Sequence, residues 1–263
     1  MQKILNRLKK KQDKLQKLKG EKFLDQKLKN YFHTEIIYIS SDIGGEKLSH
    51  KQAEGIVGQC PNFKPIAKNN KTLLQTKGQK EALEFIEDFA AQKGPIDIYI
   101  ICKVHKLIMQ EAWPEIAGQY RQENMELKKS SALLPHHSRV PEEMYFLNQY
   151  LIETQKNLEV DDTLGICEFF STIRYKLAWI HPFRDGNGRV ARFVLNLIAR
   201  RYKLPYILTP ATKLNDRMWQ AIQKADQGDL NSLIEFNLEL LGDSYDKIIR
   251  YWQKGRLPNG SKI

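Results

Sequence analysis

Apolar residues recur every three or four positions over several long stretches of the chain. This is the spacing of a helix with one buried face. The clearest stretches are residues 78–92 and 161–180. The same pattern predicts further helices at 31–45, 49–57, 97–110, 141–155, 214–226 and 230–252, and one that begins near residue 189. We therefore expect an all-α protein.

The N-terminal 30 residues form a basic segment. They hold 11 Lys/Arg and three Asp/Glu, a net +8 of the chain's +11. Its apolar residues are Ile4, Leu5, Leu8, Leu15 and Leu18. This pattern predicts an amphipathic helix that is broken near Gly20. Either the leucines dock the helix and the lysines face solvent, or the lysines form a surface for acidic proteins, lipid or nucleic acid.

Composition narrows the class of protein. The chain has 263 residues, of which 41% are hydrophobic and 28% charged, as in ordinary soluble proteins. No apolar run approaches the 18 or so residues that span a bilayer, so we expect no membrane span. Cys60, Cys102 and Cys167 are odd in number and widely spaced, so we expect reduced thiols without a metal site in a cytoplasmic protein. Outside residues 1–30 the net charge is small, so nucleic-acid binding by the rest of the chain is not expected.

Residues that could catalyse a reaction or bind an anion are concentrated at 181–189, which read His-Pro-Phe-Arg-Asp-Gly-Asn-Gly-Arg. Pro182 ends the preceding helix, because a residue before proline is pushed out of the α region. His181 therefore sits at a helix end with a restricted backbone, and it is the candidate general base. Phe183 is the large apolar side chain before the turn, so we expect it to anchor the loop in the core.

A glycine-rich turn and the start of another helix follow. Gly186, Asn187 and Gly188 can aim successive backbone N–H groups at one anion. Arg189 and Arg192 lie three positions apart on one helix face. Cations near a helix N-terminus cost roughly 0.3–1 kcal/mol each, so two arginines there indicate that an anion lies between them. The pattern predicts a polyphosphate site.

Asp185 directly precedes the glycines. Hard cations such as Mg²⁺ prefer carboxylate and phosphate oxygens, so this side chain is placed to hold a metal ion on the phosphates. The alternative reading is plainer: Asp-Gly-Asn-Gly also suits an ordinary connection between two helices, and a single histidine is more often structural.

These residues resemble the motif of Fic-domain proteins at every fixed position from His181 to Arg192. The resemblance is firm over residues 97–207. It implies a Fic-type helical bundle with a small β-hairpin flap, in which AMP passes from ATP to a hydroxyl of a target protein. In that family the residue matching His181 deprotonates the hydroxyl and the residue matching Asp185 holds Mg²⁺. The phosphates are bound by the residues matching Gly186, Asn187, Gly188, Arg189 and Arg192.

An inhibitory-type helix is expected at residues 31–45. Ser40-Ser41-Asp42-Ile43-Gly44-Gly45 resembles the family's inhibitory motif, Ser/Thr-x-x-x-Glu-Gly/Asn, except that Gly44 replaces the glutamate. In the family this glutamate pairs with the arginine matching Arg192 and blocks productive ATP binding. Glu46 lies two residues on, a turn of about 200°, and is a poor substitute.

We therefore expect a de-repressed enzyme, and any glutamate-dependent removal of AMP is in doubt. The alternative is that the two glycines merely end the helix.

Residues 118–121 and 127–140 resemble the family's flap, which pairs with a target segment beside the active site. A target protein with an acceptor hydroxyl is expected to dock around 127–140, and the chain itself is a second expected target. His136 and His137 lack carboxylates or cysteines at ligand spacing, so we expect exposed loop histidines. His105 lies among apolar neighbours and is expected to be structural.

The predicted organisation has three regions. Residues 1–92 form an N-terminal helical region, 93–207 the Fic catalytic core, and 208–263 C-terminal helices packed on that core. A homo-oligomer is left open. Two alternatives to AMP transfer remain: a Fic-fold transferase of UMP, phosphocholine or phosphate, and a non-catalytic adaptor that uses the basic N-terminus.

Overall fold

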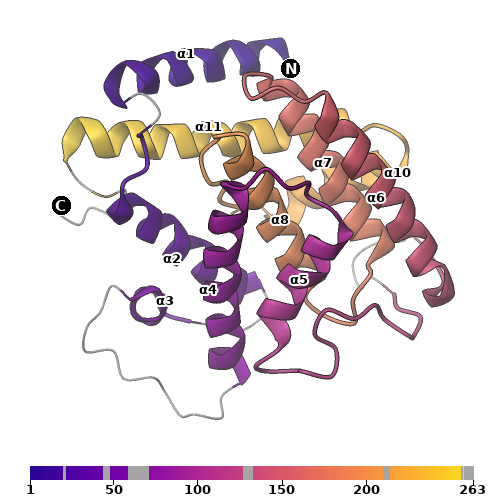
Figure 1. Ribbon diagram of the computed structural model, residues 1–263. Helices are drawn as coiled ribbons and strands as arrows, with labels where there is room; N and C mark the ends of the chain where they lie inside the picture. Colours follow the sequence, from indigo (N-terminus) through magenta and orange to yellow (C-terminus); the bar gives the residue numbers. More distant parts are fainter. Residues whose placement is uncertain are drawn as a thin grey trace.

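The computed structural model describes residues 1–19, 22–43, 48–58, 71–126, 133–209, 214–255 and 257. Throughout these residues the regular structure is helical and no strand occurs (Figure 1). The prediction of an all-α protein is confirmed. The α-helices are α1 Gln2–Lys19, α2 Gln26–Ile43, α3 His50–Val57, α4 Lys71–Ala90, α5 Ile98–Met109, α6 Val140–Lys156, α7 Thr163–Ile180, α8 Asn187–Arg201, α10 Trp219–Asp226 and α11 Asn231–Lys254. The short helices are η1 His137–Arg139 and η2 Leu214–Met218.

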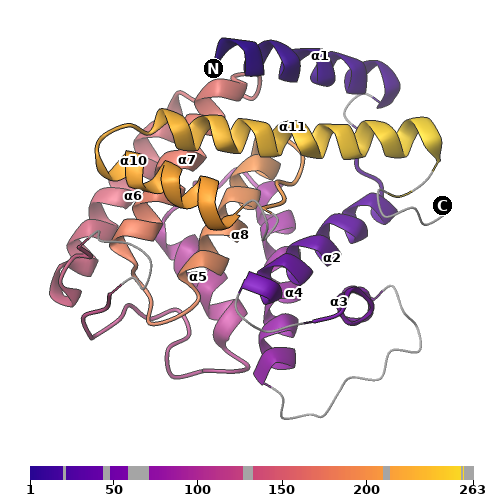
Figure 2. The same ribbon diagram turned by 180° about the vertical axis from the view of Figure 1, so that it is seen from behind.

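Helix α8 lies at the centre of the molecule. Twelve of its fifteen residues are buried. Helix α7 packs along one side of α8, and α4 and α5 pack against it from the other (Figures 1 and 2). The sequence shows only one apolar stripe on α8, whereas neighbours surround the helix. The polar and charged side chains of α8 are therefore drawn into the interior.

A close crossing of α4 and α5 depends on Gly78. A Cβ atom built on Gly78 would contact the carbonyl oxygen of Leu107 and lie 2.7 Å from that of Ile108. Any side chain at this position would therefore separate the two helices. The crossing fixes the position of α5, which carries His105.

Helix α1 lies on the outside of α11 (Figure 2). Its Leu8 and Leu15 are buried, so it docks through its leucines. The N-terminal amine pairs with Glu235 at 2.6 Å, and Lys11 pairs with Asp246 at 2.8 Å. The remaining basic side chains of this helix are exposed: Lys3, Arg7, Lys9, Lys10, Lys14, Lys17 and Lys19.

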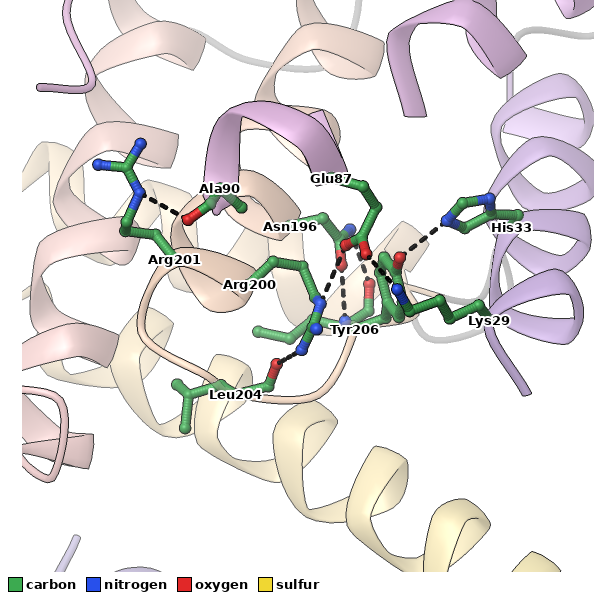
Figure 3. Close-up of polar contacts among 10 residues, drawn as sticks. Lys29, His33, Glu87, Ala90, Asn196, Arg200, Arg201, Leu204 and Tyr206 are labelled. Carbon is green, nitrogen blue, oxygen red and sulfur yellow. Dashed lines mark hydrogen bonds and ion pairs between the residues drawn. The ribbon is translucent and has the colours of Figure 1, made fainter. Parts of the chain in front are cut away.

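Helix α2 is attached to the core by a polar cluster (Figure 3). Lys29 and Arg200 pair with the two carboxylate oxygens of Glu87 at 3.2 and 3.0 Å. Burial alone would raise the pKa of Glu87, but Arg200, Tyr206 and Lys29 together lower it. His33 Nε2 lies 2.8 Å from the Tyr206 hydroxyl. Because the Tyr206 hydroxyl donates to Glu87, the Nε2–H of His33 donates to the Tyr206 oxygen.

The predicted flap hairpin is not seen. Residues 118–126 and 133–136 contain no strand, and residues 127–132 lie outside the described part. Side-chain hydrogen bonds join the two arms where a hairpin would use a backbone ladder. Arg121 Nη2 donates to Pro135 O at 2.6 Å, and Asn124 Oδ1 accepts from His137 N at 2.9 Å.

No helix in the described residues has both the length and the apolar character needed to cross a bilayer.

Candidate active site

The segment 181–186, called the motif loop below, joins α7 to α8. His181 caps α7 with φ 48° and ψ 58°, and its N–H donates to Leu177 O at 3.1 Å. Residues other than glycine rarely adopt this left-handed conformation. Arg121, from a distant segment, stabilises this conformation. Its side-chain Nε donates to His181 O at 2.8 Å, and its backbone N–H donates to Pro182 O at 2.8 Å.

The imidazole of His181 is oriented as a base. Its Nδ1 lies 3.4 Å from Ala178 O, and a carbonyl can only accept, so Nδ1 carries the hydrogen and Nε2 keeps its lone pair. Burial lowers the pKa of His181, and the neighbouring Arg121 lowers it further. The ring is therefore neutral at pH 7 and able to accept a proton.

The motif loop leads directly into the first turn of α8. Gly186 is the residue before this helix and has φ 81°, a conformation that glycine adopts without strain. The N–H groups of Asn187, Gly188 and Arg189 belong to the first turn, where a helix supplies no acceptor of its own. Three such donors can bind an anion. The sequence pattern predicted the backbone N–H of Gly186 as one of the donors, but this N–H donates to Asp185 Oδ1 at 2.6 Å.

Both motif arginines lie at this turn. Arg189 pairs with Asp185 at 2.8 Å. A Cβ built on Gly188 would lie 3.6 Å from Arg192 Nη1, so the Arg192 guanidinium lies beside the free N–H groups. Burial lowers the pKa of Arg192 to about 9, and Arg174 and Arg189 contribute. No carboxylate of the described residues forms an ion pair with Arg192.

Asn187 has a second role. Its side-chain oxygen accepts from Phe183 N at 2.9 Å, and its side-chain nitrogen donates to Phe183 O at 2.7 Å. The amide group is therefore used inside the loop, and only the backbone N–H of Asn187 is available to an anion. Phe183 is fully buried.

Asp185 is the only motif carboxylate. Its Oδ1 accepts from Gly186 N at 2.6 Å and its Oδ2 contacts Arg189, while its side chain is 55% exposed. Across the described residues, no group of three or more His, Cys, Asp or Glu could hold a metal ion. A metal here would have one protein carboxylate and would need phosphate oxygens and water for its other ligands. That ligand set suits Mg²⁺.

His105 contacts the motif loop, and the sequence did not predict this contact. Its Nε2 is 3.0 Å from Asp185 O, and its ring stacks on Phe183 with centroids 3.8 Å apart. The apolar residues around His105 suggested a core position, and nothing in the local sequence links it to a loop 80 residues away. Only the crossing of α5 and α8 brings them together.

The inhibitory-type segment reaches the site through α2. Arg192 Nε donates to Ser40 Oγ at 3.3 Å. Ser40 and Ser41 are buried, and Ser41 Oγ has no hydrogen-bond partner among the described residues. Gly44, Gly45 and Glu46 lie outside the described residues.

The segment that holds this candidate site is similar to a known protein family. Residues 95–199 match the model of the Fic/DOC family. These residues form a Fic domain. The matched range runs from the start of α5 to the end of α8, so it includes His105 and the whole motif loop.

Relatives named as enzymes extend the similarity beyond the Fic domain. A "Protein adenylyltransferase Fic" of Nematostella vectensis is 28% identical over 238 residues, which is 89% of this chain and 53% of that protein. A "Protein adenylyltransferase fic-1" of Caenorhabditis elegans is 28% identical over 204 residues, 76% of this chain and 38% of that protein. The chain thus spans about half the length of the curated relatives it matches, or less.

Solved structures share the fold. A Fic-domain-containing signaling protein from Bacteroides thetaiotaomicron matches with a TM-score of 0.79 at 21% identity, over 94% of this chain and 97% of that one. Fic-1 from C. elegans matches with a TM-score of 0.75 at 23% identity, over 96% of this chain and 73% of that one. The whole described chain therefore has the architecture of Fic proteins, including the helices outside residues 95–199.

Proposed function

We propose that this chain is a protein adenylyltransferase, which moves AMP from ATP to a Ser, Thr or Tyr hydroxyl of a target protein and of itself. His181 Nε2 accepts the hydroxyl proton as the hydroxyl oxygen attacks the α-phosphorus of ATP. A new P–O bond to the target forms, the bond to the β-phosphate oxygen breaks, and pyrophosphate leaves. The reaction needs positioning and charge stabilisation more than covalent chemistry by the protein.

The observation that carries this proposal is the pairing of a neutral base with an anion site on one short loop. His181 keeps a free Nε2. The first turn of α8 offers free N–H groups beside Arg189 and Arg192, and Arg192 has no carboxylate partner among the described residues. The names of the relatives favour AMP as the group transferred.

Asp185 is the residue proposed to hold Mg²⁺, which would neutralise phosphate charge. Its carboxylate now contacts Arg189, so Arg189 has to turn towards the phosphates when nucleotide and metal arrive. The lone carboxylate, exposed and next to the anion site, fits a metal that is held mainly by the substrate.

We further propose that the enzyme is de-repressed. The Arg192–Ser40 hydrogen bond supports the idea that α2 lies where an inhibitory helix would act. In this chain Gly44 stands at the position of the inhibitory glutamate, so no carboxylate from that position competes for Arg192. The docking segment for the target is proposed to be residues 127–140.

The test is intact-protein mass spectrometry after incubation with Mg²⁺ and ATP. The parent chain should gain the mass of one or more AMP groups. His181→Ala should gain AMP about 10²–10⁴ times more slowly while still binding ATP. Incubation with UTP or GTP in place of ATP tests which nucleotide the enzyme transfers. Equal labelling of the parent and His181→Ala would contradict the role of His181 as the general base.

A further inference from the structure

We propose that His105 is a positioning residue, whose imidazole fixes the backbone of the motif loop from below. It thereby keeps His181, the proposed base at the start of this loop, in a fixed position relative to the proposed anion site at the end of the loop. Its catalytic consequence rests on the proposed AMP transfer, whereas its structural consequence rests on geometry alone. His105 would not touch the reacting atoms.

The first observation is a pair of hydrogen bonds that fixes the ring. Gly118 N donates to His105 Nδ1 at 2.8 Å, so Nδ1 is an acceptor and carries no hydrogen. The hydrogen therefore lies on Nε2, which donates to Asp185 O at 3.0 Å. The imidazole thus links the turn after α5 to the residue just before the glycines.

The second observation is the packing of the ring itself. It stacks on Phe183 with an interplanar angle of 6°, and it is fully buried. A Cβ on Gly186 would lie 3.4 Å from His105 Cδ2. One side chain therefore contacts the loop at three places within four residues: Phe183, Asp185 and Gly186.

These contacts lie between the two halves of the proposed chemistry. His181 is two residues before Phe183, and the free N–H groups of α8 begin directly after Gly186. A shift of the Asp185 peptide would move the Asp185 carboxylate and the first turn of α8 relative to His181. Misplacement of reacting groups by about 1 Å can cost about 10²-fold in rate.

Three variants separate positioning from general stability. His105→Phe keeps an aromatic ring for Phe183 but loses both hydrogen bonds. His105→Gln keeps a side-chain N–H for Asp185 O. The matched control is Gln155→Leu, because the Gln155 amide also holds one backbone residue, accepting from Ile96 N at 2.9 Å and donating to Ile96 O at 2.8 Å.

The first readout is amide hydrogen exchange of the folded proteins, which needs no enzyme activity. In His105→Phe, the hydrogen-bonded amides of Phe183, Gly186 and Val190 should exchange about tenfold faster or more, and His105→Gln should restore part of the protection. Gln155→Leu should leave these three amides unchanged. Unchanged exchange of the three amides in His105→Phe, or an equal increase in Gln155→Leu, would overturn the proposal.

The second readout is AMP transfer. In His105→Phe we expect kcat to fall about 10²-fold and ATP affinity to fall less, with partial recovery in His105→Gln. If the parent chain transfers no AMP but exchange still responds to His105→Phe, the proposed function fails and the positioning role stands. If kcat is unchanged while the loop exchanges faster, His105 stabilises the loop without positioning it for catalysis, which would also overturn the proposal.

Discussion

Arg192 donates from its Nε to Ser40 Oγ across 3.3 Å, which joins the central helix α8 to the inhibitory-type helix α2. Arg192 is 8% exposed and Ser40 is 1% exposed, so this contact is made in the interior. A hydroxyl can orient a guanidinium but cannot neutralise it. Helix α2 therefore contacts Arg192 directly, and the proposed de-repression depends on the residue at position 44, which follows the described end of this helix.

Gly44→Glu should convert this contact into inhibition. A carboxylate at position 44 would pair with Arg192 and compete with the phosphates of ATP. We expect ATP affinity and AMP transfer to fall about tenfold or more, because a charge-assisted hydrogen bond contributes about 1.5–3 kcal/mol. Isothermal titration with ATP and intact-mass labelling measure the two effects.

Gly44→Gln is the matched control, since it adds a side chain of the same size without the charge. Inhibition by both substitutions would point to a steric effect of the side chain. Inhibition by neither would argue against the proposal that Gly44 accounts for de-repression.

Arg121→Lys should weaken the positioning of His181, the proposed general base. Arg121 donates to the carbonyls of His181 at 2.8 Å and Pro135 at 2.6 Å, and a lysine ammonium cannot make the planar set of bonds. We expect kcat to fall about 10–10²-fold with little change in the affinity for ATP. Steady-state kinetics and ATP titration check this. A fall in ATP affinity with kcat intact would place Arg121 in nucleotide binding.

Acid should weaken the attachment of α2. Burial lowers the pKa of His33 to about 4; Lys29 and Arg200 add to this shift and Glu87 opposes it. The unfolded chain protonates His33 below its ordinary pKa of 6.5, while the folded chain does not until about pH 4. The unfolded state thus binds more protons in this window, so stability falls as the pH drops from 6.5 to 4, by up to about 3 kcal/mol for His33.

His33→Gln removes this titration but keeps an N–H donor for Tyr206. Urea unfolding at pH 7, 5.5 and 4.5 should show a smaller loss of stability in the variant than in the parent. The raised pKa of Glu35, which burial causes, acts in the opposite direction but is common to both proteins. Equal pH slopes would mean that His33 is not the group that titrates.

Leu8→Ala should destabilise the whole protein. Leu8 is 2% exposed at the contact of α1 with α11, and truncation of a buried leucine typically costs about 2–5 kcal/mol. Leu18→Ala is the control on the same helix, since Leu18 is 39% exposed and its loss should cost less than about 0.5 kcal/mol. Similar unfolding midpoints for the two variants would contradict the packing of α1.

The role of the N-terminal lysines is best tested without removing α1, because the helix is part of the packed structure. Replacing Lys10, Lys14 and Lys17 by Gln changes exposed side chains only. Stability should stay within about 0.5 kcal/mol of the parent, and AMP transfer should be unchanged. Loss of transfer to the chain itself would favour a role of the basic face in activity.

The sequence alone was sufficient to predict the α-helices, because each has an apolar stripe or a terminal signal of its own. Their starts were less certain: α4 begins at Lys71 and α2 at Gln26, before the expected positions 78 and 31. Ser49 forms the predicted start of α3 with a capping box, and Pro182 coincides with the end of α7. The motif at 181–192 was readable for the same reason: base, carboxylate, glycines and arginines are neighbours in the chain. Residues that are adjacent in the chain can be interpreted together without knowing which other residues pack against them.

Only the tertiary structure decided what surrounds the motif. His105 and Arg121 contact it from segments about 60–80 residues away, and Ser40 reaches Arg192 across 152 residues. Three further features could not be predicted from the sequence. They are the burial of α8 by neighbours on several sides, the close crossing of α4 and α5 at Gly78, and the hydrogen bond from Arg121 to Pro135 where a hairpin was expected. Each depends on which helices pack together. Sequence periodicity shows which face of a helix is buried, but not which side chains lie opposite that face.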